Sequence, residues 1–423
     1  MKDKPKIAIL SIRNSYGFGG VFATLKVVHD FCAQYFDPTV FYLSFDPEVS
    51  AHLKNFKIHS RNRGATFFGM RCIEIGARWA FWEPGHYAFT KNQWAEALKE
   101  FDYFFVVSAT PIAGHPLTLL GKKFVIWIST SYDQDRVQRI EQLGGIRWLI
   151  NKLAQPSMHR IEKKVLSKAT HIIALSSYSK NEFSKVLQRN KRSISVCGYP
   201  LNPAYVPLIK KKDFSEKLII AVGRFSDPRK NFGMLMSAFG QIYKVMPAAR
   251  LCIIGSQPPV EELRPFLDER FFDAITFTGQ VSPHDLHRFY DDASLILVTS
   301  HQEGFGIAAL EGVYYGTPII TTDCGGPRDF VISGYNGYVV NINDASAMAQ
   351  HAINILSNPT LAAEFSHNGH HLADALFQQS KVFNHFKSAL TTVYPELTKY
   401  FKVQDAQHAA HLPSSQHSEA ASL

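Results

Sequence analysis

The sequence lacks the features of a membrane-spanning, secreted or zinc-stabilised protein. No stretch of its 423 residues approaches the run of about 18 apolar residues that a spanning helix needs. The five cysteines stand singly, with no CxxC pair, so neither a disulfide framework nor a zinc site is indicated. The basic start precedes an apolar run that is too short for a signal-peptide core. We therefore expect a cytoplasmic protein.

Acidic residues are scarce in the first half of the chain. Residues 1–200 hold 28 Lys and Arg against 15 Asp and Glu, whereas residues 201–423 hold 17 against 21, which together give the formal net charge of +9. A basic half predicts an anionic partner. Because no nucleic-acid-binding motif is present, we expect a phosphorylated glycan, a lipid phosphate or an anionic membrane face rather than nucleic acid. A basic surface that only aids solubility is the alternative.

Short β-rich runs alternate with helical stretches along both halves of the chain. Several runs are continuously apolar, as parallel strands covered on both faces are. The pattern predicts two doubly wound, Rossmann-like α/β domains whose carboxyl strand ends face a cleft. The expected strands are Lys6–Ile12, Val40–Phe45, Tyr103–Ser108, Phe124–Ser129, His171–Ser176, Leu218–Val222, Arg250–Ile254, Ile275–Thr278, Leu295–Thr299 and Pro318–Thr322.

Breaks in this alternation predict the domain boundaries. A first domain over residues 1–200 ends at a linker, 201–216, that is rich in proline and lysine, and a second domain covers residues 217–380. We expect a helical segment, 381–403, to return to the first domain. The last residues, 404–423, have no apolar periodicity and are expected to be a disordered tail.

The loop after the expected strand 295–299 has the composition of an anion site. Glu303 lies in it, and glycines at 304 and 306 would let the backbone approach a ligand. A helix expected from Ile307 would point the unpaired N–H groups of its first turn at an anion. Glu311 falls on the apolar face of this helix, where a carboxylate is costly unless ligand hydroxyls donate to it. A surface glutamate in another helical phase is the alternative.

Two further candidate loops each follow the first strand of one of the two expected domains. After strand 218–222, Arg224 and Lys230 can both reach a diphosphate, while we expect the turn to direct Arg229 outward. After the first strand of the chain comes the turn Tyr16-Gly-Phe-Gly-Gly20, in which Phe22 stands where a dinucleotide fingerprint needs its last glycine. An NAD-dependent oxidoreductase is therefore disfavoured. A solvated basic loop and a purely structural turn are the respective alternatives.

Taken together, these residues resemble the retaining glycosyltransferases of family 4, which have the GT-B fold. The likeness is densest over residues 218–340 and thinner in the first half. The family's E-x7-E pair corresponds to Glu303 and Glu311. Its G-R-x5-K loop corresponds to Gly223-Arg224 and Lys230, and its Gly-Gly turn to Gly19-Gly20.

The resemblance implies a role for each of these residues. Arg224 and Lys230 would neutralise the donor pyrophosphate, and Glu303 would hold the transferred sugar. The backbone of Phe305, Gly306 and Ile307 would cap the pyrophosphate, and Glu311 would hold the ribose hydroxyls. The segment around Gly279 and Val281 would border the base. Gly19 and Gly20 would close onto the donor from the first domain.

The resemblance also implies an activity. A hexosyl group would move, with retention of configuration, from a UDP- or GDP-sugar to an anionic glycan or glycolipid acceptor, as in surface polysaccharide or lipopolysaccharide biosynthesis. The leaving nucleoside diphosphate needs charge neutralisation more than a metal, so no cofactor is expected. Asp133-Gln-Asp135 has the spelling of a metal-binding DxD motif, but acids are favoured in a helix's first turn in any case, and we expect no metal there.

The chain departs from the family at two positions. Many members have a His where this chain has Ser129-Thr130-Ser131, and whether Ser129 or Thr130 takes over its role stays open. Gly312 follows the second glutamate, where Ala is commoner. The missing His makes a catalytically inactive homologue, which binds nucleotide-sugar or scaffolds a partner enzyme, the alternative to an active transferase.

One segment of the first half has the character of an interfacial helix. Residues 146–153 combine Trp148 with leucine, isoleucine and basic residues, and Arg160, Lys163 and Lys164 follow. We expect peripheral contact with the anionic inner face of a membrane. Burial of Trp148 in the core is the alternative.

Overall fold

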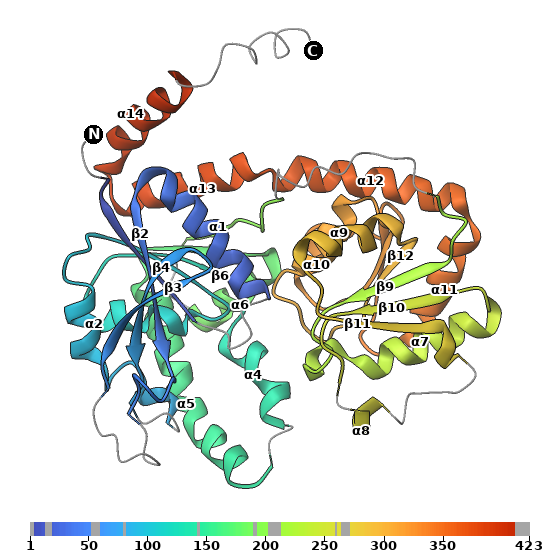
Figure 1. Ribbon diagram of the computed structural model, residues 1–423, viewed down its shortest axis with the longest axis horizontal. Coiled ribbons are helices and arrows are strands. Elements are labelled where there is room, and N and C mark those ends of the chain that lie inside the picture. Colours follow the sequence, from blue (N-terminus) through green and yellow to red (C-terminus); the bar gives the residue numbers. More distant parts are fainter. Residues whose placement is uncertain are drawn as a thin grey trace.

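The computed structural model describes residues 4–12, 19–51, 60–78, 82–141, 144–188, 193–201, 213–258, 260–263 and 271–410. These residues form two α/β domains, each built on a largely parallel sheet with helices packed against it (Figure 1). The predicted fold class, two doubly wound Rossmann-like domains, is confirmed.

The first domain is built on eight strands in the order β3-β4-β2-β1-β5-β6-β7-β8. Only the pair β3–β4 is antiparallel among the described strands of this sheet. Its strands are β1 Lys6–Ser11, β2 Asp37–Ser44, β3 Asn62–Phe67, β4 Met70–Gly76, β5 Tyr103–Ser108, β6 Val125–Ile128, β7 His171–Ala174 and β8 Ile194–Val196. Its helices and 3-10 turns are α1 Gly20–Tyr35, η2 Glu83–Gly85, α2 Lys91–Ala97, η3 Pro111–Gly114, α3 His115–Leu119, α4 Tyr132–Glu141, α5 Gly145–Lys168 and α6 Ser177–Leu187.

The second domain is built on six parallel strands in the order β11-β10-β9-β12-β13-β14. The strands are β9 Leu218–Val222, β10 Arg250–Ile254, β11 Ile275–Gly279, β12 Leu295–Val298, β13 Ile319–Thr322 and β14 Gly337–Val340. The helices and 3-10 turns are η5 Pro228–Lys230, α7 Phe232–Val245, α8 Val260–Leu263, η7 Phe272–Ala274, α9 Pro283–Asp292, α10 Ile307–Tyr314, η8 Gly326–Asp329, α11 Ala345–Ser357 and α12 Pro359–Phe377. Ile219, Ile220 and Ala221 in the middle of β9 are fully buried, as expected of a strand covered on both faces.

The hairpin β3–β4 is absent from the predicted strands. Its two-residue turn, Phe68-Gly69, has φ of +48° and +76°. A turn with two positive φ values usually carries Asn-Gly, so a phenylalanine there conceals the hairpin from sequence reasoning. The short strands β8 and β14 are also additions to the predicted set.

The last two helices lie on the first domain. Helix α13, Gln379–Val393, runs along the first domain (Figure 1). Its buried Phe386 packs edge-on against Phe31, Phe105 and Trp127. Helix α14 runs over Leu397–Ala410, so helix continues past 403, and residues 404–410 of the expected disordered tail are helical. Residues 411–423, and residues 202–212 of the expected linker, lie outside the described part of the chain.

Candidate functional site

The two domains touch where the loop after β12 meets the ends of the first sheet's strands. A Cβ at Gly304 would lie 2.6 Å from the carbonyl oxygen of Ser129, which follows β6. The Ser176 hydroxyl, just after β7, donates to the carbonyl oxygen of Gly304 at 2.6 Å. Glycine at 304 therefore lets the first domain close directly on this loop.

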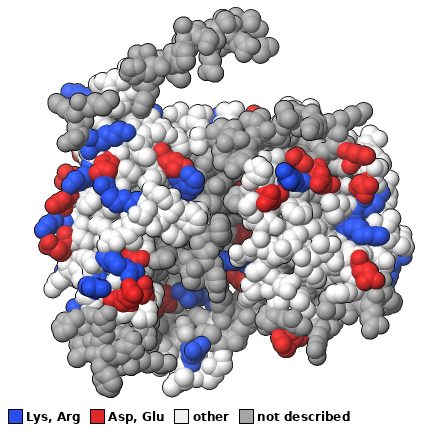
Figure 2. Space-filling model, in the orientation of Figure 1, with Lys and Arg blue, Asp and Glu red and all other residues white. Residues whose placement is uncertain are grey.

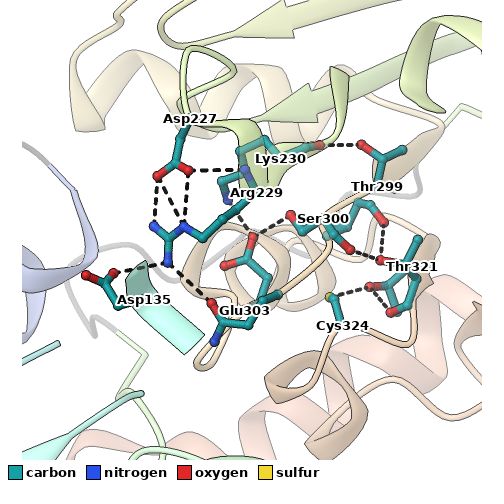
Figure 3. Close-up of polar contacts among 12 residues, drawn as sticks. Asp135, Asp227, Arg229, Lys230, Thr299, Ser300, Glu303, Thr321 and Cys324 are labelled. Carbon is teal, nitrogen blue, oxygen red and sulfur yellow. Dashed lines mark hydrogen bonds and ion pairs between the residues drawn. The ribbon is translucent and has the colours of Figure 1, made fainter. Parts of the chain in front are cut away.

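Glu303, next in that loop, is held by a lysine from another loop of the same domain. Lys230 Nζ lies 2.5 Å from Glu303 Oε1, and the Ser300 hydroxyl donates to the same oxygen at 2.7 Å (Figure 3). Burial alone would raise the pKa of Glu303, but the charge and hydrogen bond of Lys230 and the bond from Ser300 hold it below its ordinary value. The carboxylate is thus ionised and oriented.

The position of Lys230 depends on a missing side chain at Gly223 and on one contact of its own backbone. Its aliphatic stem lies over Gly223, where a Cβ would be 3.1 Å from Lys230 Cε. Its carbonyl oxygen accepts from the Thr299 hydroxyl at 2.8 Å, which ties η5 to the end of β12. The start of the G-R-x5-K loop is therefore glycine because the lysine folds back over it.

One of the two arginines of this loop, Arg229, differs in direction from the sequence expectation. Arg224 is partly buried just past β9, and its carbonyl oxygen accepts from the Asp227 N–H at 2.9 Å. Arg229 was expected to point outward, which is wrong: its side chain is 15% exposed and pairs with Asp227 and with Asp135 of the first domain. The expectation fails because the acid that draws Arg229 inward lies on the other domain.

Helix α10 begins at a bare glycine that faces both domains. Its N-cap, Gly306, has φ +88°, and a Cβ there would lie 2.9 Å from Pro327 Cγ. No side chain of the described residues caps this helix, so its first N–H groups remain available to an anion. Ile307 lies against Gly20, where a Cβ would be 3.6 Å from Ile307 Cδ1, while the Phe305 side chain is buried in the core. The structure thus brings the Gly-Gly turn to the start of α10.

Glu311, one turn further along α10, has a protein donor that the sequence did not indicate. The Tyr290 hydroxyl, from α9, donates to Glu311 Oε2 at 3.2 Å. Burial raises the pKa of Glu311 to about 7, and the bond from Tyr290 offsets only part of that. Ligand hydroxyls are therefore not its sole possible donors, but a second carboxylate oxygen is left for them.

Gly312 has a packing reason. A Cβ at this position would lie 1.9 Å from Ile296 Cδ1 and 3.2 Å from Tyr290 Cδ1. Glycine here and isoleucine on β12 are a matched pair, since alanine would overfill the space. This departure from the family pattern belongs to the core and leaves the neighbouring Glu311 in place.

The remaining donor-side candidates lie at strand ends. Gly279 closes β11 with φ +68°, and Val281 follows it, partly buried against the core. Gly19, with φ +128°, is the N-cap of α1. Gly17 of the same turn lies outside the described residues.

The segment that replaces the family's His is bonded across the domain boundary. The Thr130 hydroxyl accepts from Gln302 Nε2 at 3.2 Å, and the Ser129 carbonyl oxygen accepts from the Ser179 hydroxyl. Both acids of the DxD-like motif are paired: Asp133 Oδ1 lies 2.5 Å from His159 Nε2, and Asp135 faces Arg229. In the described part of the chain, no group of three or more His, Cys, Asp or Glu is arranged to hold a metal.

The first turns of helix α5 present apolar side chains to solvent. Ile146 is 73% exposed and Leu153 63%, and Leu149 and Trp148 are also exposed. Burial of Trp148 in the core is therefore wrong; Lys152 Nζ lies 5.9 Å from its ring centre. Across the residues with described positions, no helix has both the length and the apolar character needed to cross a bilayer.

The second domain matches a known family. Residues 208–372 fit the model of "Glycosyl transferases group 1". The capsular polysaccharide biosynthesis glycosyltransferase CapM of Staphylococcus aureus is 24% identical over 308 residues, 69% of this chain and 78% of CapM. The poly(glycerol-phosphate) alpha-glucosyltransferase of Bacillus subtilis is 27% identical over 187 residues, 44% of this chain but only 27% of that protein.

Solved structures share the arrangement of both domains. A sucrose-phosphate synthase from Thermosynechococcus elongatus superposes with a TM-score of 0.70 at 18% identity, over 94% of this chain and 100% of that one. HepE of Anabaena, solved with UDP-glucose, gives a TM-score of 0.64 at 16% identity, over 92% and 99% of the two chains. At such identities the likeness establishes the fold.

Proposed function

We propose that this chain, a group 1 glycosyltransferase with the GT-B fold, moves a hexosyl group from a UDP- or GDP-sugar to a glycan or glycolipid acceptor. The observation that carries the proposal is the meeting of Lys230, Glu303 and the uncapped start of α10, with Gly20 opposite in the other domain. A cation, a carboxylate and free N–H groups at one point suit a sugar joined to a diphosphate.

Donor binding on this site is an exchange of partners. Lys230 leaves Glu303 for the pyrophosphate, where Arg224 and the N–H groups of α10 also bind. Glu303 then accepts hydrogen bonds from hydroxyls of the transferred sugar, and Glu311 accepts from the ribose. The exchange keeps every buried charge partnered, because each loses one partner as it gains another.

The chemical step needs no protein base. The acceptor hydroxyl oxygen bonds to the anomeric carbon on the same face from which the leaving group departs. The bond between that carbon and the phosphate oxygen breaks. The electron pair of this bond stays on the nucleoside diphosphate, whose oxygen takes the acceptor's proton. Arg224 and Lys230 stabilise the charge that develops there, which is the largest contribution to the rate in such a site.

The test is hydrolysis of nucleotide-sugars by the purified protein. UDP- and GDP-sugars are incubated with wild type and with Glu303→Ala, and the released nucleoside diphosphate is measured. We expect turnover by wild type that Glu303→Ala abolishes, while Glu364→Ala, at an exposed glutamate of α12, keeps full activity. Binding without turnover for any donor or acceptor would replace the proposal by the inactive homologue.

Thermal shifts identify the donor base. The protein is heated with UDP, GDP and their sugars, and the ligand that fits stabilises the fold. At 100 times its dissociation constant a ligand adds about 2.7 kcal/mol to the free energy of unfolding. Stabilisation by neither nucleotide would contradict the proposed donor site.

The acceptor side is proposed to lie against an anionic membrane. Helices α4 and α5 project from the first domain in Figure 1, and α5 exposes Ile146, Trp148, Leu149 and Leu153 beside basic residues. Figure 2 shows basic and acidic side chains interspersed over both domains on its face, so the basic surplus forms no continuous patch there. Membrane docking in this proposal is therefore made by α5, whose apolar side chains contribute more to it than its basic ones.

Cosedimentation with vesicles tests this docking. We expect wild type to pellet with phosphatidylglycerol vesicles and Leu149→Ser/Leu153→Ser to stay in solution. Leu376→Ser, at a leucine of α12 that is 47% exposed against 49% for Leu149, is the control and should pellet like wild type. Wild type that stays in solution even at low salt would contradict the proposal.

A further inference from the structure

The buried Arg229 joins the two domains at the donor site. Its Nη2 lies 2.8 Å from Asp227 Oδ2 in its own loop, and its Nη1 lies 3.3 Å from Asp135 Oδ1 on α4 of the first domain (Figure 3). The same Nη1 donates to Gln302 Oε1 at 3.3 Å. One guanidinium thus bonds to three groups: Asp227 and Gln302, from two loops of its own domain, and Asp135, from helix α4 of the other domain.

Arg229 is also fixed to the residues that face the donor. It precedes Lys230 in η5, and its carbonyl oxygen accepts from the His301 N–H at 2.7 Å, two residues before Glu303. The Asp227 carboxylate accepts from the Arg229 N–H at 3.2 Å, so the turn itself is held by the same acid. A displacement of Arg229 therefore moves Lys230 and the loop of Glu303 together.

The ion pair of Arg229 with Asp135 is connected to further charged side chains of the first domain. Asp135 Oδ2 lies 3.7 Å from Arg136 Nε, and Arg136 Nη2 lies 2.8 Å from Glu83 Oε1. Asp135 and Arg229 have side chains only 13% and 15% exposed. A buried ion pair adds little net stability compared with an apolar contact, but it admits few geometries and so fixes the orientation of the parts it joins.

We propose that Arg229 is a positioning residue: its pair with Asp135 holds the two domains in the closed arrangement in which Lys230 and Glu303 meet the donor. The inference rests on the proposed function and adds to it the regulation of the same site. Arg229 itself touches no substrate in this scheme. Closure brings Gly20 to α10, and the Asp135–Arg229 pair sets how often that arrangement is populated.

Asp135→Asn tests the pair without touching the donor loop. The amide keeps the shape of the side chain and removes its charge, and Asp133→Asn is the matched control, since Asp133 pairs with His159 inside the first domain. We expect Asp135→Asn to raise the radius of gyration measured by solution X-ray scattering. UDP-glucose turnover should fall about 10-fold in kcat while UDP affinity stays unchanged, because the donor domain is intact.

The outcomes separate the pair from the function. Expansion of Asp135→Asn with no turnover of any UDP- or GDP-sugar by any form would keep the inference and overturn the proposed activity. Turnover and scattering that match Asp133→Asn would overturn the inference and keep the activity. UDP affinity that falls as far as kcat would assign Arg229 to the donor domain alone and also overturn it. Arg229→Lys keeps the charge but not the fork, and should lie between wild type and Asp135→Asn in both measurements.

Discussion

Each domain buries one glutamate whose pKa is raised to about 7, Glu162 in the first and Glu311 in the second. Burial is the main cause in both, and one hydrogen bond opposes it in each. Glu162, 2% exposed on α5, accepts from the backbone N–H of Tyr132 at 2.8 Å, where α4 begins. Glu311 accepts from the Tyr290 hydroxyl and remains partly accessible. Equal shifts in pKa therefore accompany a helix cap in one case and a partly accessible carboxylate, the proposed ribose contact, in the other.

The difference lies in what a ligand can reach. A perturbed pKa indicates a functional group only where geometry leaves the group an open partner. Glu162 is enclosed, and its oxygen completes the start of a helix. Glu311 lies one turn from the uncapped start of α10. The comparison predicts that substitutions of Glu311 affect nucleotide binding and that substitutions of Glu162 affect stability.

The largest expected effect is on donor affinity. Glu311→Ala removes the acceptor for the ribose hydroxyls, and because hydrogen bonds to a charged group are worth about 1.5–3 kcal/mol each, nucleotide affinity should fall about 100-fold. Isothermal titration with UDP and GDP measures it. Glu162→Ala should leave affinity unchanged among molecules that remain folded; an equal loss there would break the comparison.

A smaller effect is expected on stability, and with the roles reversed. Glu162→Ala leaves the N–H of Tyr132 buried without an acceptor, which costs about 1–3 kcal/mol in the free energy of unfolding. Urea denaturation measures the change. Glu162→Gln keeps a carbonyl oxygen for this bond and should retain most of the stability, whereas Glu311→Gln, which removes a buried charge, should cost none. Equal losses for Glu162→Gln and Glu162→Ala would contradict the capping role.

Sequence reasoning identified Glu311 but not Glu162 for a physical reason. Glu311 falls in a helix with clear apolar phase, next to glycines that mark a close approach. Glu162 lies in a basic stretch of α5, and its partner, the N–H of Tyr132, is a backbone group thirty residues earlier. Local pattern carries no information about such a contact.

The same limit explains the other differences. Five of the six strands of the second domain were predicted closely, β9 and β10 to the residue, because continuous apolar runs mark buried parallel strands. The direction of Arg229 was wrong because Asp135 lies in the other domain. The hairpin β3–β4 was missed because Phe68 adopts a positive φ that its identity does not suggest. A contact between distant segments decided the direction of Arg229, and an unusual local backbone conformation concealed the hairpin.

The smallest effect expected is on pH dependence, and it separates the two glutamates most finely. Both have folded pKa values near 7, above the ordinary 4.5, so the stability that comes from their protonated forms is fully present below pH 4.5 and is lost as the pH rises through about 7. For binding the sign is opposite, since in the proposed complex the ribose hydroxyls donate to the ionised Glu311. Nucleotide affinity should therefore rise by up to about tenfold between about pH 6 and about pH 8.

The glutamine variants of the two residues show which group causes the rise of nucleotide affinity with pH. The nucleotide's terminal phosphate also titrates, with a pKa of about 6, so the measure is the difference between wild type and Glu311→Gln at each pH. Glu311→Gln should keep only the phosphate's share of the slope in affinity. Glu162→Gln should keep the whole slope in affinity yet flatten part of the slope in unfolding free energy. If Glu162→Gln instead reduced the pH dependence of binding, the two buried carboxylates would be coupled through the closed domain interface, and the contrast between cap and ligand contact would fail.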